Sequence, residues 1–232
     1  MRIFYLLLLI IAFSSCKKKE PGQPVSSPSL GYNYFPLRTL DFRVYDVDSI
    51  IYNDFTQTID TFHYEIKEKV DINFTDGEGN SAFKIVRFIK YTDTTDYVAV
   101  DNWSANFTAN TCERIEENIR YVKLNLPPSN GKEWDGNAKN SLDTWKYKYK
   151  DIHTAKTFGA YSFDSTITVI QHDDENKILT QRIYAEEQYA KHIGLYYRKY
   201  TNLKKTYDSQ SGTYKATSGF DMEMRLKSHY VQ

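Results

Sequence analysis

Alternation of apolar and polar side chains recurs along much of the chain, and it limits what the chain can fold into. It is clear at residues 40–45 (LDFRVY) and again at 62–67 (FHYEIK). Successive side chains of a β-strand point to opposite faces of a sheet, so this alternation is typical of strands. The chain also contains 20 tyrosines and 13 phenylalanines, which favour half-buried pleated surfaces. Together these features predict an all-β protein.

The expected strands are separated by segments that have the composition of turns. Asp76-Gly77 and Gly79-Asn80 are hairpin signals, and polar stretches at 171–177 and 208–219 suit further turns. Pro127-Pro128 ends a strand and opens a loop over 127–140. Strands are predicted at residues 40–52, 62–67, 83–88, 97–100, 106–113, 121–126, 143–152, 161–171, 176–187, 191–203 and 219–230.

Helices contribute little to this prediction. Helix-forming residues occur at 114–120 and 185–191, but neither segment shows two turns of 3.6-residue periodicity. An open sheet of about ten strands tends to curl or close, because closure protects its edges. We therefore expect a single antiparallel meander of about ten strands that forms a barrel or a strongly curved half-barrel. Such a barrel can enclose one ligand, or its aromatic side chains can fill it.

The N-terminus carries a different signal. Residues 3–13 are an apolar run that follows Arg2, and Ser14, Ser15 and Cys16 come directly after it. The run is too short to cross a bilayer, which takes about 20 residues. A charged start, a short apolar segment and small residues before a cleavage site are typical of a secretory signal. The alternatives are an ordinary secretory signal that happens to end near a cysteine and an uncleaved anchor helix.

The segment around Cys16 resembles a bacterial lipobox, in which the cysteine sulfur is lipidated before cleavage. Phe13 stands where the usual lipobox has an aliphatic residue. The resemblance implies that residues 1–15 are a lipoprotein signal peptide and that Cys16 is the lipid attachment site and the first mature residue. Residues 16–30 are rich in Pro, Ser and charge, which predicts a flexible tether, and residues 31–232 are expected to form the β-domain.

The amino-acid composition limits which partners and which kinds of chemistry are expected. The chain has 30 basic and 30 acidic side chains, which gives no electrostatic case for binding nucleic acid. With Cys16 lipidated, Cys112 has no cysteine to pair with, and a buried apolar role is expected for it. The membrane is an expected partner through the lipid anchor, and no cofactor is expected.

We find no catalytic or metal-binding constellation in the sequence. The run HDDE at 172–175 has metal-capable side chains, but consecutive strand residues alternate between faces and it suits a solvated turn. The five histidines lack zinc-ligand spacing. The carboxylate pairs Glu116-Glu117 and Glu186-Glu187 are expected on solvated faces. We therefore predict that the protein is not an enzyme.

Three tryptophans are candidate ligand-binding residues. Trp103, Trp134 and Trp145 each lie beside Asn, Asp, Ser, Gly or Thr. An aromatic face next to polar donors and acceptors suits a sugar-binding cleft. The alternative is structural: Trp103 and Trp145 pack in the core, and Trp134 folds its loop over one end of the barrel.

Two regions resemble a set of uncharacterised Bacteroidota lipoproteins, namely residues 33–55 at the start and residues 133–137 with 187–200 late in the chain. The late stretch YAKHIGL is also similar to a turn-and-strand element of lipocalin-like and lipoprotein-carrier-like β folds. Within it, Gly194 is expected to permit a bulge or a close backbone approach. The resemblance implies an architecture and a cell-envelope location.

We therefore expect a lipid-anchored protein of a Gram-negative outer membrane. An acidic run after the cysteine marks surface export in Bacteroidota lipoproteins, and this chain has Lys-Lys-Lys-Glu instead, so the periplasmic face is favoured over the cell surface. The hypothesis is non-enzymatic binding of an apolar or amphipathic ligand, or of an envelope protein partner. The alternative is a glycan-binding accessory lipoprotein of an outer-membrane uptake system, which would bind through Trp134 and its loop.

Overall fold

The computed structural model describes residues 30–174 and 177–231. The predicted signal peptide, Cys16 and nearly all of the predicted tether lie outside the described residues. Within the described part, no helix has the length and apolar character needed to span a membrane.

The described residues form a short 3-10 helix and twelve strands, so the predicted all-β class is confirmed. The elements are η1 (Tyr32–Tyr34), β1 (Phe42–Asn53), β2 (Thr58–Thr75), β3 (Ser81–Lys90), β4 (Val98–Phe107), β5 (Thr111–Glu116), β6 (Ile119–Asn125), β7 (Glu133–Asp135), β8 (Lys146–Phe158), β9 (Tyr161–Asp173), β10 (Gln181–Ala190), β11 (Gly194–Asp208) and β12 (Thr213–Tyr230).

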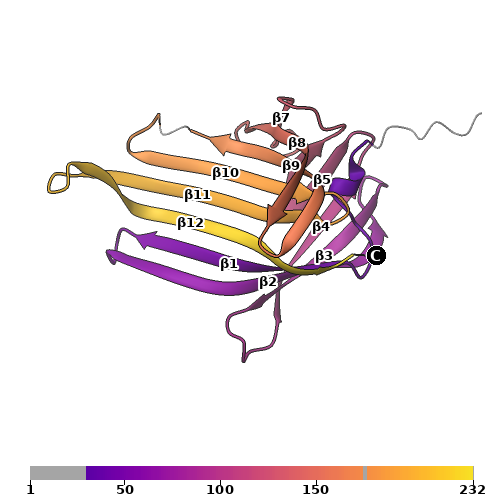
Figure 1. Cartoon of the computed structure of the whole chain (residues 1–232), viewed down its shortest axis with the longest axis horizontal. Helices are drawn as coiled ribbons and strands as arrows, with labels where there is room; N and C mark the ends of the chain where they lie inside the picture. Colours follow the sequence, from indigo (N-terminus) through magenta and orange to yellow (C-terminus); the bar gives the residue numbers. More distant parts are fainter. Residues whose placement is uncertain (1–29, 175–176, 232) are drawn as a thin grey trace, which may run out of the picture.

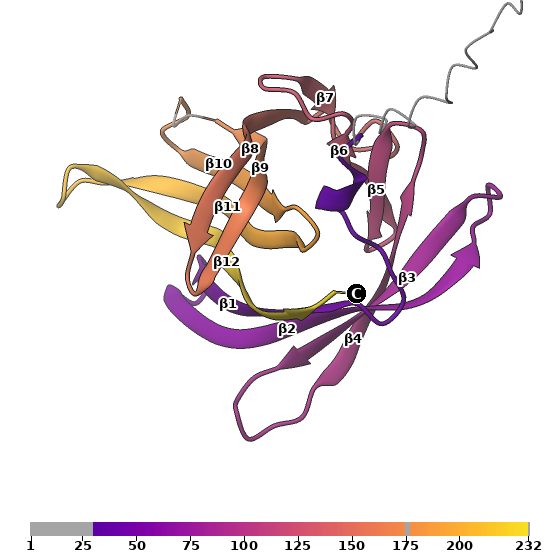
Figure 2. The same cartoon turned by 45° about the vertical axis from the view of Figure 1, so that its right-hand side comes forward.

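The strands form one antiparallel sheet that curls into a nearly closed barrel (Figures 1 and 2). Every strand except β6 and β7 pairs with its chain neighbours, and β1 pairs with β12, so β6 and β7 are the two edges. The edges are linked by a few hydrogen bonds rather than by a ladder. The backbone N–H of Val122 donates to the Gly136 carbonyl at 2.9 Å, and the Trp134 indole N–H donates to the Val122 carbonyl at 2.8 Å. The expected meander is thus confirmed.

The strand count of about ten is corrected to twelve. The strand that the eleven predicted segments lack is β7, which lies inside the predicted loop 127–140 and is too short for alternation to show. Two turns also lie where the alternation hid them. The predicted strand 106–113 is broken by a turn in which the N–H of Thr108 donates to the Thr111 carbonyl at 3.0 Å. In the segment 114–120, Glu117 and Asn118 have φ values of 48° and 62° and form the two-residue hairpin loop between β5 and β6. Positive φ at both central positions is typical of a type I′ turn, which matches the twist of the flanking strands.

Several strand ends also differ from the prediction. The polar stretch 208–219, expected as a hairpin tip, belongs mostly to β11 and β12, whose pairing continues to Asp208 and Thr213. Backbone hydrogen bonds hold this ladder whatever the polarity of its side chains. Conversely, β10 begins only at Gln181, after a turn over 178–180. Trp134, expected in a loop, lies in the three-residue strand β7.

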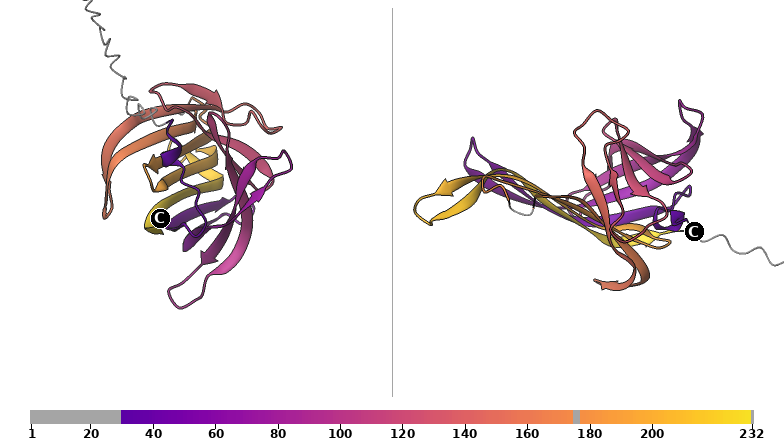
Figure 3. Two further views of the ribbon diagram at one scale, coloured as in Figure 1. Left: turned by 90° about the vertical axis from the view of Figure 1, so that its right-hand side faces the viewer. Right: turned by 90° about the horizontal axis from the view of Figure 1, so that it is seen from above.

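The sheet has two regions. At one end it wraps around a core of buried aromatic and aliphatic side chains, with η1 packed inside the barrel (Figure 2). At the other end the long strands continue as a nearly flat segment, seen edge-on in the right panel of Figure 3. We call this segment the sheet extension; it comprises residues 48–53 of β1, 58–63 of β2, 181–186 of β10, 199–208 of β11 and 213–223 of β12.

The expectations for Cys112 and Gly194 agree with the structure. Cys112 is fully buried in the core, and burial raises the pKa of its thiol. Gly194 starts β11 with a φ of 93°, where an added Cβ would lie 3.0 Å from Arg43 Nε. The Arg43 side chain donates from Nε to the Ile193 carbonyl directly beside it. The glycine therefore permits both a left-handed backbone and the close approach of a buried guanidinium.

Candidate functional site

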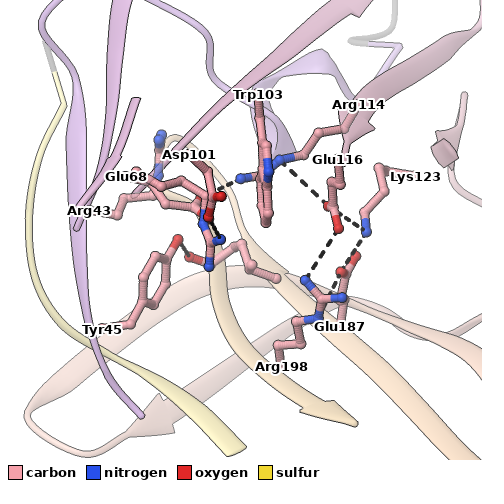
Figure 4. A network of polar contacts seen from close by, with 12 residues as sticks. Arg43, Tyr45, Glu68, Asp101, Trp103, Arg114, Glu116, Lys123, Glu187 and Arg198 are labelled. Carbon is pink, nitrogen blue, oxygen red and sulfur yellow. Dashed lines mark hydrogen bonds and ion pairs between the residues drawn. The ribbon is translucent and has the colours of Figure 1, made fainter. Parts of the chain in front are cut away.

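The barrel interior contains a buried network of charged side chains (Figure 4). Four acidic and four basic residues face one another from seven strands: Glu68, Asp101, Glu116 and Glu187 with Arg87, Arg114, Lys123 and Arg198. The set is electrically balanced. Since an unpaired buried charge is strongly unfavourable, this balance is what allows the network to lie inside the barrel.

One half of the network centres on Lys123, in β6, which bridges the barrel to β10. Its ammonium lies 2.7 Å from Glu187 Oε1 and 3.2 Å from Glu116 Oε1. Arg198 of β11 also approaches both carboxylates, at 3.5 and 3.6 Å. Glu187 accepts a further hydrogen bond from the Tyr189 hydroxyl. These contacts join β5 and β6 near one edge of the sheet to β10 and β11 across the barrel.

The other half centres on Glu68 of β2. Arg114 Nη2 lies 2.7 Å from Glu68 Oε2, and Arg87 Nε lies 3.3 Å from Glu68 Oε1. The Trp103 ring lies between the two guanidinium groups, whose carbon atoms are 3.8 Å (Arg87) and 4.5 Å (Arg114) from its centroid. Stacking of this kind orients both cations toward Glu68. Trp103 is thus a structural part of the network.

The network controls the ionisation of two carboxyl groups, those of Glu68 and Glu116. Burial alone would raise the pKa of Glu68, but Arg114 and Arg87 lower it below its usual range. Burial would likewise raise the pKa of Glu116, but Lys123 and Arg198 hold it well below its usual range. Both groups therefore remain carboxylates at neutral pH, and their charges favour the folded state.

A pocket of about 300 Å³ lies beside the Lys123 half of the network, under the loop between β7 and β8. Its lining combines aromatic walls with polar and charged groups. The lining residues are Glu116, Tyr121, Lys123, Asn137, Leu142, Asp143, Trp145, Tyr147, Gln171, Ala185, Arg198 and Tyr200. A volume near 300 Å³ is at the lower end of the range for sites that bind small molecules. A second cavity, beside Arg43 and Glu68, has a volume of only about 30 Å³.

Trp145 forms part of the pocket wall. Its ring is 4.7 Å from the His172 ring and 6.3 Å from the Tyr200 ring, between centroids. The loop that carries it is held by Asp135, whose Oδ1 accepts from the N–H groups of Asn137 (2.9 Å) and Trp145 (3.2 Å). This side-chain bonding to the local backbone fixes the loop without an extended ladder.

The pocket contains a buried donor that the protein does not use. Gln171 is 4% exposed, and its Nε2 has no hydrogen-bond partner among the residues that the structure describes. A buried amide N–H without an acceptor is unfavourable, typically by 1–3 kcal/mol. A ligand hydroxyl or carbonyl oxygen that reached this buried nitrogen from the pocket would remove that penalty.

The three candidate tryptophans therefore have different surroundings. Trp145 lines the pocket. Trp134 is buried, stacks against Tyr149 at 4.6 Å between ring centroids and links β7 to β6. Trp103 is buried between two arginines. Of the three, Trp145 alone lines the pocket described here, so the ligand-binding hypothesis is developed on this residue.

The carboxylate pairs require a correction. We expected Glu116-Glu117 and Glu186-Glu187 on solvated faces, but Glu187 is 1% exposed and Glu116 is also buried. Strand alternation turns Glu187 of β10 into the barrel, and Glu116 is the last residue of β5 before the hairpin loop that holds Glu117. Cations inside the barrel meet both buried carboxylates. No sequence pattern points to these partners, since Lys123 and Glu187 are 64 residues apart.

The remaining sequence candidates do not form a site. Asp173 and Asp174, from the HDDE run, pair with Arg182 at 2.7 and 2.5 Å. His63 is exposed and lies 2.8 Å from Asp48. In the described ranges, no cluster of three or more His, Cys, Asp or Glu side chains is arranged to hold a metal ion.

Comparison with known proteins gives structural neighbours only. No family model matches the chain, and no curated protein matches it. A structure described as a lipoprotein from Parabacteroides distasonis has a TM-score of 0.41 and 12% identity, and covers 85% of this chain and 98% of its own. An exported protein with a YmcC-like fold from Bacteroides fragilis has a TM-score of 0.42 and 11% identity, and covers 84% of this chain and 98% of its own.

A third neighbour is an outer membrane lipoprotein-sorting protein domain from Vibrio parahaemolyticus, with a TM-score of 0.21 and 11% identity over 82% of this chain and 85% of that one. Because all three scores lie below 0.5, no family is assigned to this chain.

Proposed function

We propose that this protein is a lipid-anchored, non-enzymatic protein of the cell envelope whose β-domain binds a small amphipathic ligand in the Trp145 pocket. The observation that carries the proposal is the unused buried donor of Gln171 in a pocket with aromatic walls. Apolar walls with a few convergent polar groups are typical of small-molecule sites. The pocket charges are balanced, so the ligand is expected to carry no large net charge.

Aromatic and polar groups have distinct roles in this proposal. Trp145 and Tyr200 offer ring surfaces against which an apolar face of the ligand packs. Gln171 Nε2 donates to a ligand oxygen. Asn137 is already engaged, since its side-chain amide donates to the Asp143 carbonyl at 2.6 Å, and it holds the loop rather than the ligand.

A glycan is the second candidate ligand, and the combination of Trp145 with the Gln171 amide favours it. Sugar rings present an apolar face and a rim of hydroxyl groups, and both would be satisfied here. The protein would then be a glycan-binding accessory of an outer-membrane uptake system. Binding to a glycan array, lost in Trp145→Ala, would support this candidate over a lipid-like ligand.

The function is tested by two pocket variants and a matched control. Trp145→Ala removes an aromatic wall, and Gln171→Leu removes the unpartnered donor. Both are expected to weaken ligand binding at least tenfold, and Gln171→Leu should leave stability unchanged or raised, because it removes an unsatisfied group. Tyr207→Ala changes an exposed tyrosine of β11 outside the pocket and should bind like the wild type. Equal binding by all four proteins would contradict the proposal.

The anchor is tested separately. Cys16 is proposed to carry the lipid, and mass spectrometry of the mature N-terminal peptide would identify a diacylglyceryl-modified, N-acylated cysteine. A Cys16→Ser chain is expected to remain uncleaved at this position. Protease treatment of intact cells would distinguish the proposed periplasmic face, which is protected, from the cell surface.

A further inference from the structure

The two faces of the sheet extension differ in polarity. Strand register places residues of β1, β2, β11 and β12 in rows across the sheet, and residues two apart along a strand share a face. In the part of the chain that the structure describes, no second layer packs on the extension (right panel of Figure 3). The side chains that each face presents to solvent therefore follow from the register of these four strands.

On the outer face, the two rows nearest the barrel are mainly charged and polar, and the third row carries Tyr52, Ile59 and Leu203. The row of Asp48 contains His63 on β2, Glu223 on β12 and Lys199 on β11. Lys199 lies 2.8 Å from Asp221, and Arg225 lies 3.0 Å from Glu223. These two rows are satisfied in water and need no partner.

The opposite face continues the lining of the barrel interior and is apolar. Beyond the interior row of Val47, Met224 and Arg198, the register brings two further rows to this face. They contribute the side chains that we call the apolar strip: Ile51, Phe62, Tyr200, Phe220 and Met222. Ile51 and Phe62 are 42% and 44% exposed. Asp60 and Asn202 flank the strip on the outer row, so it is narrow.

The apolar strip begins at the Trp145 pocket. Tyr200 belongs to both: it lines the pocket, its ring faces Trp145, and it contacts the Phe220 ring edge-on at 5.0 Å between centroids. Phe220 is the direct register partner of Ile51. An unbroken path of apolar side chains therefore leads from the pocket onto the uncovered sheet.

We propose that the apolar strip receives the hydrocarbon tail of an amphiphile whose polar head lies in the Trp145 pocket. This inference rests on the function proposed above and defines its ligand class. The head meets the Gln171 donor and the ring of Trp145. The tail then leaves past Tyr200 and lies along Phe220 and Ile51, which shields their exposed surface from water.

The size of the strip favours a chain over a protein partner or a second copy. Five side chains that are less than half exposed offer at most about 400 Å², whereas a stable protein interface needs about 800 Å² from each partner. The two rows are about 7 Å apart along the strands. At about 1.3 Å of reach per methylene, a tail of about eight carbons covers this length and the contacts at both ends.

The test uses n-alkyl β-D-glucosides with tails of four to ten carbons, kept below the concentrations at which they form micelles. Binding to the chain from residue 17 onward is measured by titration calorimetry. Affinity is expected to rise about twofold per methylene, because an open face buries about half of each added group, and to level off near eight carbons. Phe220→Ser and Ile51→Ser should flatten this dependence. Ile50→Ser is the matched control, since Ile50 is the neighbouring residue on the outer face.

The outcomes separate this inference from the proposed function. A chain-length dependence that Phe220→Ser removes and Ile50→Ser preserves supports the inference. Binding that is lost in Trp145→Ala but is independent of tail length would overturn the role of the apolar strip and leave the proposed ligand site in the Trp145 pocket standing. Binding of no glucoside overturns the inference and counts against the pocket. A dimer in light scattering that Ile51→Ser dissociates would assign the strip to a second copy and overturn the inference.

Discussion

Removal of the Lys123 ammonium is expected to destabilise the fold strongly. Lys123 is 3% exposed and lies between Glu187 and Glu116, at 2.7 and 3.2 Å. Lys123→Met keeps most of the apolar stem but leaves two buried carboxylates without their nearest cation. Arg198 then lies 3.5 and 3.6 Å from them, Arg114 lies 3.6 Å from Glu116, and the Tyr189 hydroxyl donates to Glu187. Breaking a buried ion pair by removing one partner typically costs about 3–5 kcal/mol of unfolding free energy.

Urea denaturation followed by circular dichroism measures this cost. With a slope of about 2.5 kcal/mol/M, a loss of about 4 kcal/mol lowers the unfolding midpoint by about 1.6 M. Lys148→Met is the matched control, because Lys148 pairs with Glu133 at 3.6 Å on the surface with both side chains about half exposed. Its effect should lie within about 1 kcal/mol.

A double variant distinguishes the network from simple loss of packing. Glu187→Gln added to Lys123→Met removes one of the two unpaired charges, so it is expected to recover part of the lost stability. The reasoning would be refuted if Lys123→Met unfolded within 0.5 M urea of the wild type, or if the double variant were less stable by the sum of the two single effects.

Three further predictions follow from single positions. Gly194→Ala should lower the unfolding free energy by about 1–2 kcal/mol, because φ is 93° and Arg43 lies close to the added Cβ. Gly77→Ala is the control: the space around Gly77 is open, so its unfolding free energy should stay within about 0.5 kcal/mol of the wild type in the same assay. Glu68 has a lowered pKa in the folded state, so its stabilisation of the fold is present above the unfolded pKa near 4.3 and is lost on further acidification. The urea midpoint is therefore expected to be constant from pH 5 to 7 and to fall below about pH 4.3. A midpoint that rises below that pH would contradict this prediction. Cys112 should resist thiol reagents in the folded protein, because it is buried and burial raises the pKa of its thiol. Reagent absorbance should show that it reacts only in urea. Rapid labelling without denaturant would show that the core opens.

The sequence predicted the β class and the meander well, because side-chain alternation is a local property. Strand boundaries were less accurate. The hairpin at Glu117 and Asn118 has helix-forming neighbours and no glycine, so its positive φ values left no mark in the composition. The polar ends of β11 and β12 were predicted as a turn, since backbone pairing there does not depend on hydrophobic side chains.

The candidate site was predictable only in part. Trp145 was identified from its polar neighbours, and it does line the pocket. Gln171 and Arg198 had no distinguishing sequence context, and they come together only because β9 and β11 curl toward β5 and β6 around the barrel. The buried network was missed for the same reason. A charged residue in an alternating strand looks solvated until the opposite wall of the barrel supplies its partner.

The most direct test of the central claim is native mass spectrometry of the chain from residue 17 onward, exported to a bacterial periplasm and purified without denaturant or detergent. We predict an added mass that organic solvent removes, identified as an amphiphile, in the wild-type protein and in Tyr207→Ala but not in Trp145→Ala. A bare protein mass in all three proteins, or an added mass that persists in Trp145→Ala, would contradict the assignment of the pocket.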